Sequence, residues 1–362
     1  MNFDQAIELQ EQAWSLQSQG KLEEASMACR EALRLVEEAE GTWSPDIANL
    51  LNDLAEIECD RQSFREALKL AKRAQTIVRR VGDGFRGETA QRIWVRTLRL
   101  LGTIRTTLGE YAHAETDLQS ALAITLCEFG EASVETAEAR NDLGVLYKHW
   151  GRFEEALRLY ENALQSIGKE SPEAGTLYHN IGGILHAQGK YAAAEEPARK
   201  AWDISRGRLG EDDPKAMVDA VAYAAVLDGL ERYEESEPIY HRALKIFEMG
   251  HNPDHFEIAA TLHNLAALLA TSRRYGEAEQ SYRRALAIKQ KLLGADAVET
   301  PLTGHNLGSM LLSLGRSQEG LPLLKSAVAV LEKNLVPRHP CLLRARENML
   351  NAIREHRRKW RF

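Results

Sequence analysis

The stretch DLGVLYKHWGRFEEALRLYENA, from Asp142 to Ala163, reads as two helices joined by a tight turn that begins at Gly151. Small residues stand at regular places around this turn, at Gly144, Ala156 and Ala163. Small side chains on one face of a helix allow a neighbouring helix to approach closely. The stretch therefore predicts a helix hairpin with a closely packed interface.

The same turn recurs along the whole chain, so the hairpin is a repeating unit. Successive turns are 42, 47, 42, 38, 42, 42 and 42 residues apart. The eight turns begin at Gly20, Gln62, Gly109, Gly151, Gly189, Glu231, Arg273 and Gly315.

Three columns of small residues keep the same distance from every turn. An aromatic residue two positions after most turns, such as Phe153 or Tyr191, is expected to fill the gap that these small residues leave. No run of residues reads as a β-strand, so the predicted fold is all-α. Twelve residues after the turns stand Ala32, Ala74, Ala121, Ala163, Ala201, Ala243, Ala285 and Ala327. Five residues after them stand Ala25, Ala67, Ala114, Ala156, Ala194, Ser236, Ala278 and Gly320. Seven residues before them stand Ala13, Ala55, Gly102, Gly144, Gly182, Ala224, Ala266 and Gly308.

The joints between hairpins carry signals that stop one helix and start the next. Glycine can end a helix with a positive φ, and a capping residue followed by proline favours a helix start. The predicted stops are Gly130, Gly210 and Gly294, and the predicted starts are Ser44-Pro45, Ser171-Pro172, Asp213-Pro214, Asn252-Pro253 and Thr300-Pro301.

These columns resemble the tetratricopeptide repeat, through the Leu-Gly of DLGVLY, the Gly-x-Tyr/Phe turn and the two alanines after it. The usual period of about 34 residues is mostly 42 here, which is similar to the repeats of kinesin light chains and their bacterial relatives. The resemblance implies a right-handed α-solenoid of about eight helix hairpins over residues 1–335. A basic capping helix over residues 336–362 would follow it.

Composition and charge restrict the class of protein. The net charge of −7 gives no general attraction to nucleic acid or anionic lipid. The four cysteines have no C-x-x-C spacing, and the N-terminus lacks the basic flank and apolar run of a signal peptide. No apolar run reaches the length of a membrane span, and no hydrolase, zinc-protease or P-loop motif is present. We expect a cytoplasmic, non-enzymatic protein without cofactor, metal, membrane or small-molecule ligand.

The longest step between turns contains the segment GDGFRG, from Gly82 to Gly87. It matches the glycine pattern of a dinucleotide site, but such a site needs a strand before the loop and here a helix is predicted. We interpret the segment as a lengthened joint between two hairpins.

In the family the first helix of each hairpin lines an inner groove, and the resemblance places Arg96, Arg99, Asn141 and Lys148 on that face. Two guanidinium groups in one cavity would favour a carboxylate or acidic side chain of a partner. The alternative is that Arg96 and Arg99 pair with acids of the chain itself, such as Glu56 or Glu138.

A histidine and asparagine motif repeats on the same face. Neighbouring helices lie about 8–10 Å apart, whereas zinc ligands lie about 2 Å from the metal, so a shared metal site is not predicted. Asparagine and neutral histidine can both donate to and accept from a peptide backbone, and these asparagines resemble the family's peptide-backbone clamp. The alternative is that they tie adjacent helices together. The residues are His179, Asn180, His186, His263, Asn264, His305 and Asn306.

The C-terminal segment is strongly basic. From Arg338 onward it contains eight Lys or Arg and two Asp or Glu. It reads as a capping helix with a solvated basic face, and the alternative is a patch for nucleic acid or an acidic partner.

The predicted function is that of a scaffold or adaptor which binds a peptide segment of a partner protein in its concave groove, with acidic character near Arg96 and Arg99. The alternative is a structural or regulatory subunit of a larger assembly, which contacts partners through its outer helices or ends and can self-associate. The sequence argues against nucleic acid as the partner because of the net charge.

Overall fold

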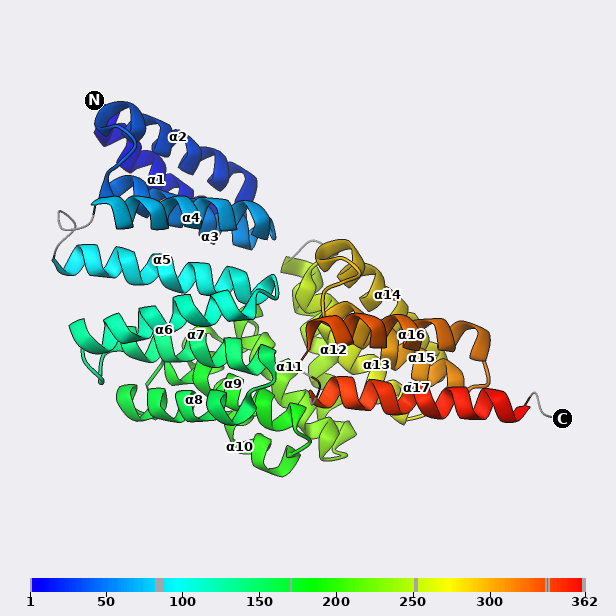
Figure 1. Cartoon of the computed structure of the whole chain (residues 1–362). Helices are drawn as coiled ribbons and strands as arrows, with labels where there is room; N and C mark the ends of the chain where they lie inside the picture. Colours follow the sequence, from blue (N-terminus) through cyan, green and yellow to red (C-terminus); the bar gives the residue numbers. More distant parts are fainter. Residues whose placement is uncertain are drawn as a thin grey trace. The chain divides into compact units, whose positions relative to one another are not determined.

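The computed structural model describes residues 2–81, 87–169, 171–250, 253–335, 337 and 339–359. These residues form seventeen α-helices and no β-strand (Figure 1). Sixteen of the helices form eight hairpins and α17 (Pro340–Lys359) follows them, so the predicted all-α fold of repeated hairpins is confirmed. The first helices are α1 (Asn2–Ser18), α3 (Pro45–Asp60), α5 (Glu88–Thr107), α7 (Val134–Trp150), α9 (Ala174–Ala187), α11 (Pro214–Gly229), α13 (Phe256–Thr271) and α15 (Glu299–Ser313). The second helices are α2 (Leu22–Glu40), α4 (Phe64–Val81), α6 (Tyr111–Glu128), α8 (Phe153–Ile167), α10 (Tyr191–Leu209), α12 (Tyr233–Gly250), α14 (Tyr275–Leu293) and α16 (Ser317–Asn334).

The columns of small residues lie inside the hairpins, as predicted. All eight alanines twelve residues after the turns are buried. The predicted bulky partner is wrong, however, at two glycines of the first helices. A side chain added at Gly102 or Gly144 would overlap Leu118 or Tyr160, which stand nine residues after their turns rather than two. A buried side chain of the second helix therefore occupies the space that each glycine leaves.

The tight turns share one backbone conformation whether or not they carry glycine. All eight turn residues have a positive φ, and in three of them, Gln62, Glu231 and Arg273, the residue is not glycine. At Arg273 the φ is 61°, and the next amide, that of Arg274, donates back to the Leu269 carbonyl at 2.8 Å. This hydrogen bond closes the end of the first helix in the manner of a Schellman motif. The motif and not the glycine is thus the common feature of the turns.

Five of the eight predicted stops and starts behave as expected. The stops Gly130, Gly210 and Gly294 all have a positive φ, and the starts at Ser44 and Asp213 are capped. The Ser44 Oγ accepts a hydrogen bond from the Ile47 amide at 3.3 Å, and Asp213 Oδ1 accepts one from the Lys215 amide at 2.8 Å. Gly210 ends α10 with a φ of 98°. The Ser44 and Asp213 caps satisfy amides that the first turn of each helix leaves without a partner.

Other predicted helix starts are wrong. Helix α9 begins after Ser171-Pro172, at Ala174, and α15 already begins before Thr300. The Thr300 hydroxyl instead donates to the Gly294 carbonyl at 2.8 Å. Helix α13 is capped by His255, whose Nδ1 accepts a hydrogen bond from the amide of Glu257. The predicted start at Asn252 and most of the 82–87 joint lie outside the described residues.

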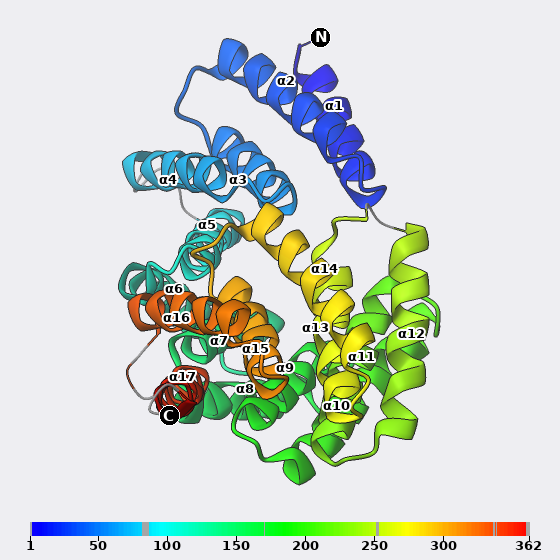
Figure 2. The same ribbon diagram turned by 90° about the vertical axis from the view of Figure 1, so that its right-hand side faces the viewer.

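The chain divides into two compact units. Unit 1 comprises Met1–His149 with Glu154–Ile167, and unit 2 comprises Trp150–Phe153 with Gly168–Phe362. Helix α3 contacts α5 in unit 1, and α9, α11, α13, α15 and α17 contact one another in succession in unit 2 (Figure 2). Each unit thus has a surface formed by neighbouring first helices and, in unit 2, by α17. We call this surface the first-helix face.

Helix α17 continues the stack of unit 2. It packs against α16 through the buried residues Leu342 and Ala345, and it also contacts α15. Its contact with α15 therefore continues the series of contacts between α11, α13 and α15.

Candidate functional site

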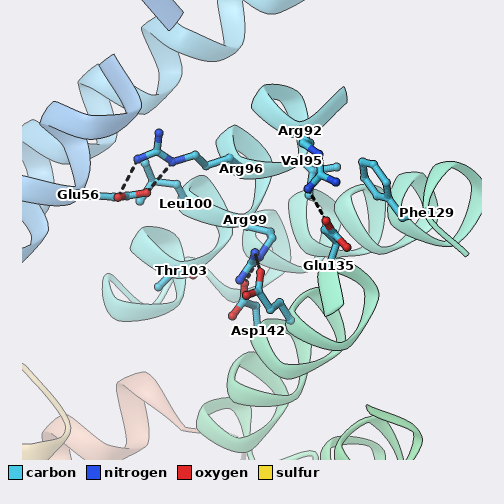
Figure 3. Close-up of a pocket in the computed structure, with 11 residues that line it drawn as sticks. Glu56, Arg92, Val95, Arg96, Arg99, Leu100, Thr103, Phe129, Glu135 and Asp142 are labelled. Carbon is cyan, nitrogen blue, oxygen red and sulfur yellow. Dashed lines mark hydrogen bonds and ion pairs between the residues drawn. The ribbon is translucent and has the colours of Figure 1, made fainter. Parts of the chain in front are cut away.

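An open cavity of about 500 Å³ lies on the first-helix face of unit 1 (Figure 3). Helix α5 presents Arg92, Arg96 and Arg99 to it, because residues three or four positions apart share one face of a helix. Acidic side chains of α3 and α7 stand opposite these arginines (Figure 3). The complete lining is Glu56, Arg92, Val95, Arg96, Arg99, Leu100, Thr103, Phe129, Glu135, Glu138 and Asp142.

Arg96 is bound to helix α3 by all of its guanidinium nitrogens. Its Nε donates to Glu56 at 2.9 Å, one terminal nitrogen donates to Asn49 at 2.9 Å, and the other donates to Asp53 at 2.7 Å. Asp53 is almost completely buried, and burial raises the pKa of its carboxyl while Arg96 opposes the rise. Arg96 therefore supplies the positive charge that a buried carboxylate needs.

Arg99 is bound to helix α7 in the same way. Its Nε donates to Asp142 at 2.6 Å, and a terminal nitrogen donates to Glu138 at 2.5 Å. Burial raises the pKa of Asp142, and the neighbouring Arg99 opposes this shift. Arg92 is paired with Glu135 and lies over the ring of Phe129, with 4.9 Å between the guanidinium carbon and the ring centroid.

The arginines of this cavity are thus neutralised by the chain itself. Of the two possibilities for Arg96 and Arg99, pairing with intramolecular acids such as Glu56 and Glu138 is the one that the structure shows. The cavity has three arginines and four carboxylates in its lining, so it offers both signs of charge. Asn141 and Lys148 also lie on α7 and are partly exposed, but they are not among the described residues that line it.

In unit 2 a chain of hydrogen bonds crosses α13, α15 and α17. Asn306 Nδ2 donates to His263 Nε2 at 3.2 Å, and Asn348 Nδ2 donates to His305 Nε2 at 3.2 Å. The remaining ring nitrogens donate, from His263 Nδ1 to Thr303 Oγ1 at 2.9 Å and from His305 Nδ1 to Asn306 Oδ1 at 3.1 Å. We call this arrangement the His–Asn ladder. Each histidine accepts at Nε2, so both are neutral and protonated at Nδ1.

The ladder shows that Asn306 ties adjacent helices together. This is the alternative to a peptide-backbone contact that the sequence left open. Asn348 extends the ladder to α17, although the sequence analysis did not identify it. It stands 42 residues after Asn306, so the repeat period alone could have found it.

The other predicted residues have different environments. His179 Nδ1 lies 2.7 Å from Asp219 Oδ1, which joins α9 to α11. Asn180 is buried. The ring of His186 packs beside that of Tyr191 with 5.4 Å between centroids, and burial of His186 lowers its pKa. Asn264 is half-buried, and its side chain makes no hydrogen bond within the described part of the chain.

The neutral histidines should make stability depend on pH. Burial, with a smaller effect of Lys289, lowers the pKa of His263 from 6.5 to about 3. A histidine with a lower pKa in the folded state binds protons less well there than in the unfolded chain. Stability is therefore fully present above pH 6.5 and is lost as the pH falls toward 3. We expect His263 alone to lower the free energy of unfolding by about 1.4 kcal/mol for each pH unit in this window.

A His263→Gln variant tests this expectation, because the glutamine oxygen can still accept from Asn306. Its free energy of unfolding in urea should fall by about 1.4 kcal/mol less than that of the wild type between about pH 7.5 and 5.5. His241→Gln is the control, since His241 is 58% exposed on α12. An unchanged pH dependence in His263→Gln would contradict the neutral ladder.

Two further properties concern the described residues only. No three His, Cys, Asp or Glu side chains among them converge as the ligands of a metal ion would. None of their helices combines the length and apolar character that crossing a bilayer requires.

Comparison with known families identifies the repeat. Two family models described as tetratricopeptide repeat match the chain, one at residues 95–166 and 217–291 and the other at residues 175–215 and 303–340. Together they cover more than half of the chain, so this chain belongs to the tetratricopeptide repeat family. The resemblance stated from the turns and small-residue columns is confirmed.

The chain is also similar to two larger proteins. It is 23% identical over 233 residues to Protein KINESIN LIGHT CHAIN-RELATED 1 of Arabidopsis thaliana, with 62% of this chain covered. It is 24% identical over 208 residues to the Clustered mitochondria protein homolog of Homo sapiens, with 54% covered. The chain spans only 36% and 15% of the lengths of these relatives. The first match agrees with the kinesin-light-chain-like repeat expected from the 42-residue period.

Solved structures share the fold at low identity. The apo form of the quorum sensor NprR from B. thuringiensis has a TM-score of 0.61 at 15% identity, covering 90% of this chain and 87% of that one. The apo form of RapI has a TM-score of 0.59 at 16% identity, covering 79% and 98%. A Rap protein complexed with Competence and Sporulation Factor has a TM-score of 0.56 at 15% identity, covering 97% and 98%.

Proposed function

We propose that this protein is a non-enzymatic scaffold that binds an extended peptide segment of a partner protein along the first-helix face. The observation that carries the proposal is the open cavity beside α5, whose charged side chains are already held in place by ion pairs. A preformed surface loses little conformational freedom on binding, so more of the contact energy contributes to affinity. A Rap protein of this fold was solved in complex with a second molecule, and we propose the same kind of use here.

The charges of the cavity limit the kind of peptide segment that it can bind. Glu138 and Arg92 each leave about half of the side chain exposed, at 50% and 49%. A guest segment with both basic and acidic side chains could pair with them. An exclusively acidic segment would have to displace the carboxylates that hold Arg96 and Arg99. The acidic partner expected at these arginines therefore finds no support in this cavity.

Of the predicted histidine and asparagine contacts, we retain Asn264 as a contact for the peptide backbone. Its amide can both donate and accept, and no neighbouring side chain uses it in the described part of the chain. Asn306, His263 and His305 are occupied by the His–Asn ladder, so for them we propose a positioning role.

The test fills the cavity without touching its ion pairs. Thr103 is exposed and lines the cavity, and Thr107 is exposed one helical turn further along α5 but is not part of the lining. We expect Thr103→Trp to weaken binding of bead-displayed random peptides at least about tenfold, and Thr107→Trp to leave it unchanged. Equal binding by the two variants, or no binding by the wild type, would refute the proposed surface.

A further inference from the structure

A second open cavity, of about 380 Å³, lies on the first-helix face of unit 2. It is formed by α13, α14, α15 and α17 and lies beside the His–Asn ladder. Its lining combines aromatic and aliphatic side chains with hydroxyl, amide and guanidinium groups. The described residues that line it are Ala267, Ala270, Thr271, Tyr275, Tyr282, His305, Asn306, Ser309, Met310, Ser313, Arg344 and Asn348.

The charge in this cavity differs from that in unit 1. Among the described residues that line it, Arg344 is the one that carries a charge, because His305 is neutral. None of these residues has a carboxylate. Arg344 is exposed and makes no hydrogen bond or ion pair within the described part of the chain. By contrast Arg346, two residues further along α17, donates to Glu332 at 2.8 Å. The guanidinium of Arg344 is therefore uncompensated, unlike those of Arg96 and Arg99.

The polar neighbours of Arg344 do not supply a negative charge. His305 accepts from Asn348 at Nε2, and its pKa is lowered by burial and then by Arg344. The Ser313 hydroxyl donates to the Met310 carbonyl at 2.7 Å and so turns its hydrogen away from the cavity. The Ser309 hydroxyl receives only a long contact from Asn348, at 3.5 Å, and can donate to a ligand.

We propose that Arg344, assisted by the Ser309 hydroxyl, binds a carboxylate group carried by an acidic side chain of the bound peptide segment. This rests on the proposed peptide-binding function and places its anionic contact in unit 2. The planar fork of donors in arginine matches the two oxygens of a carboxylate. No acid among the described lining residues competes with the guest carboxylate. In unit 1, by contrast, carboxylates of the chain already pair with the arginines of the cavity.

The test compares charge-matched peptides and charge-matched variants of the full chain. The probes are two pools of random peptides, capped at both ends, that differ only in a central residue, Glu or Gln. We expect the wild type to bind the Glu pool about tenfold more tightly than the Gln pool, the usual size of a charge-assisted hydrogen bond. Arg344→Gln should abolish this preference. Arg346→Gln removes the same charge outside the cavity and should retain it.

The outcomes separate this inference from the proposed function. Peptide binding without a Glu preference, or a preference that survives Arg344→Gln, would overturn the assignment of Arg344 and leave the peptide-binding function standing. If neither pool binds, the proposed function fails, and glutarate is then the probe of the site. A glutarate-dependent shift of the Arg344 side-chain resonance, absent in Arg344→Gln, would assign the carboxylate to a small molecule. The absence of this shift would overturn the proposed carboxylate site.

Discussion

Arg96→Met is expected to lower the free energy of unfolding by about 3 kcal/mol at neutral pH, because it leaves a buried carboxylate without its counter-charge. Asp53 is 2% exposed and keeps only the hydrogen bond from Gln10, at 2.5 Å, once Arg96 is removed. Methionine preserves much of the aliphatic stem, so the loss reports charge and hydrogen bonding rather than packing. Urea unfolding at pH 7 measures it.

The pH dependence of this loss identifies its origin. Burial raises the pKa of Asp53, and Arg96 is the largest influence that lowers it. Without Arg96 the pKa rises further, and a protonated Asp53 carries no charge that needs a partner. The variant should therefore regain part of its loss as the pH falls from about 7 to about 5.

Arg34→Met is the matched control, because Arg34 pairs with Glu31 and Glu38 on the exposed face of α2. Exposed ion pairs contribute little to stability, so this variant should unfold like the wild type. Equal losses for the two arginines would contradict the role given to Asp53. Because Arg96 stabilises the fold, reduced binding by an Arg96 variant would not by itself locate a binding site.

Gly320→Leu is expected to destabilise the eighth hairpin by about 3 kcal/mol or more, through overpacking. The backbones of α15 and α16 touch at this point. A Cβ atom on Gly320 would lie 2.6 Å from the Gly308 carbonyl oxygen and 2.8 Å from Leu312 Cγ. Backbone atoms cannot move aside as a flexible side chain can, so the two helices would have to separate. Urea unfolding followed by circular dichroism measures the loss.

Gly207→Leu provides the control for this variant. Gly207 is an exposed residue of helix α10, and nothing lies within 4 Å of the position that its Cβ would take. Leucine has a higher helix propensity than glycine, so this variant should be as stable as the wild type or slightly more stable. A similar loss in both variants would contradict the role given to the contact between α15 and α16, because Gly207→Leu makes no such contact.

The fold could be predicted because its determinants are local and repeated. A small residue such as Ala163 or Ala243 is needed wherever two helices of a hairpin cross, and eight such crossings leave a column visible in the sequence. Single joints were harder to predict. Ser44 caps a helix, but Thr300 does not, because its hydroxyl is bound to the carbonyl of Gly294. A side chain with two possible partners cannot be assigned from its neighbours in sequence.

The candidate site shows the same division. The repeat register placed Arg96, Arg99 and His263 on the first helices, but two outcomes remained open for each residue. Their partners Asp53, Asp142 and Asn306 are about forty residues away in sequence, on an adjacent first helix. Whether a charge faces a partner there depends on the crossing of two helices. Residue spacing does not describe that geometry.

By itself the sequence determined that this protein is a stack of α-helical hairpins, because small residues in register leave the chain few other ways to bury its apolar surface. Only the tertiary structure decided which charges are available for binding. It pairs Arg96 and Arg99 with carboxylates of adjacent helices, and it leaves Arg344 in a cavity whose described lining contains no acid. Electrostatic pairing acts over a few ångströms between side chains of different helices, so it depends on how those helices pack.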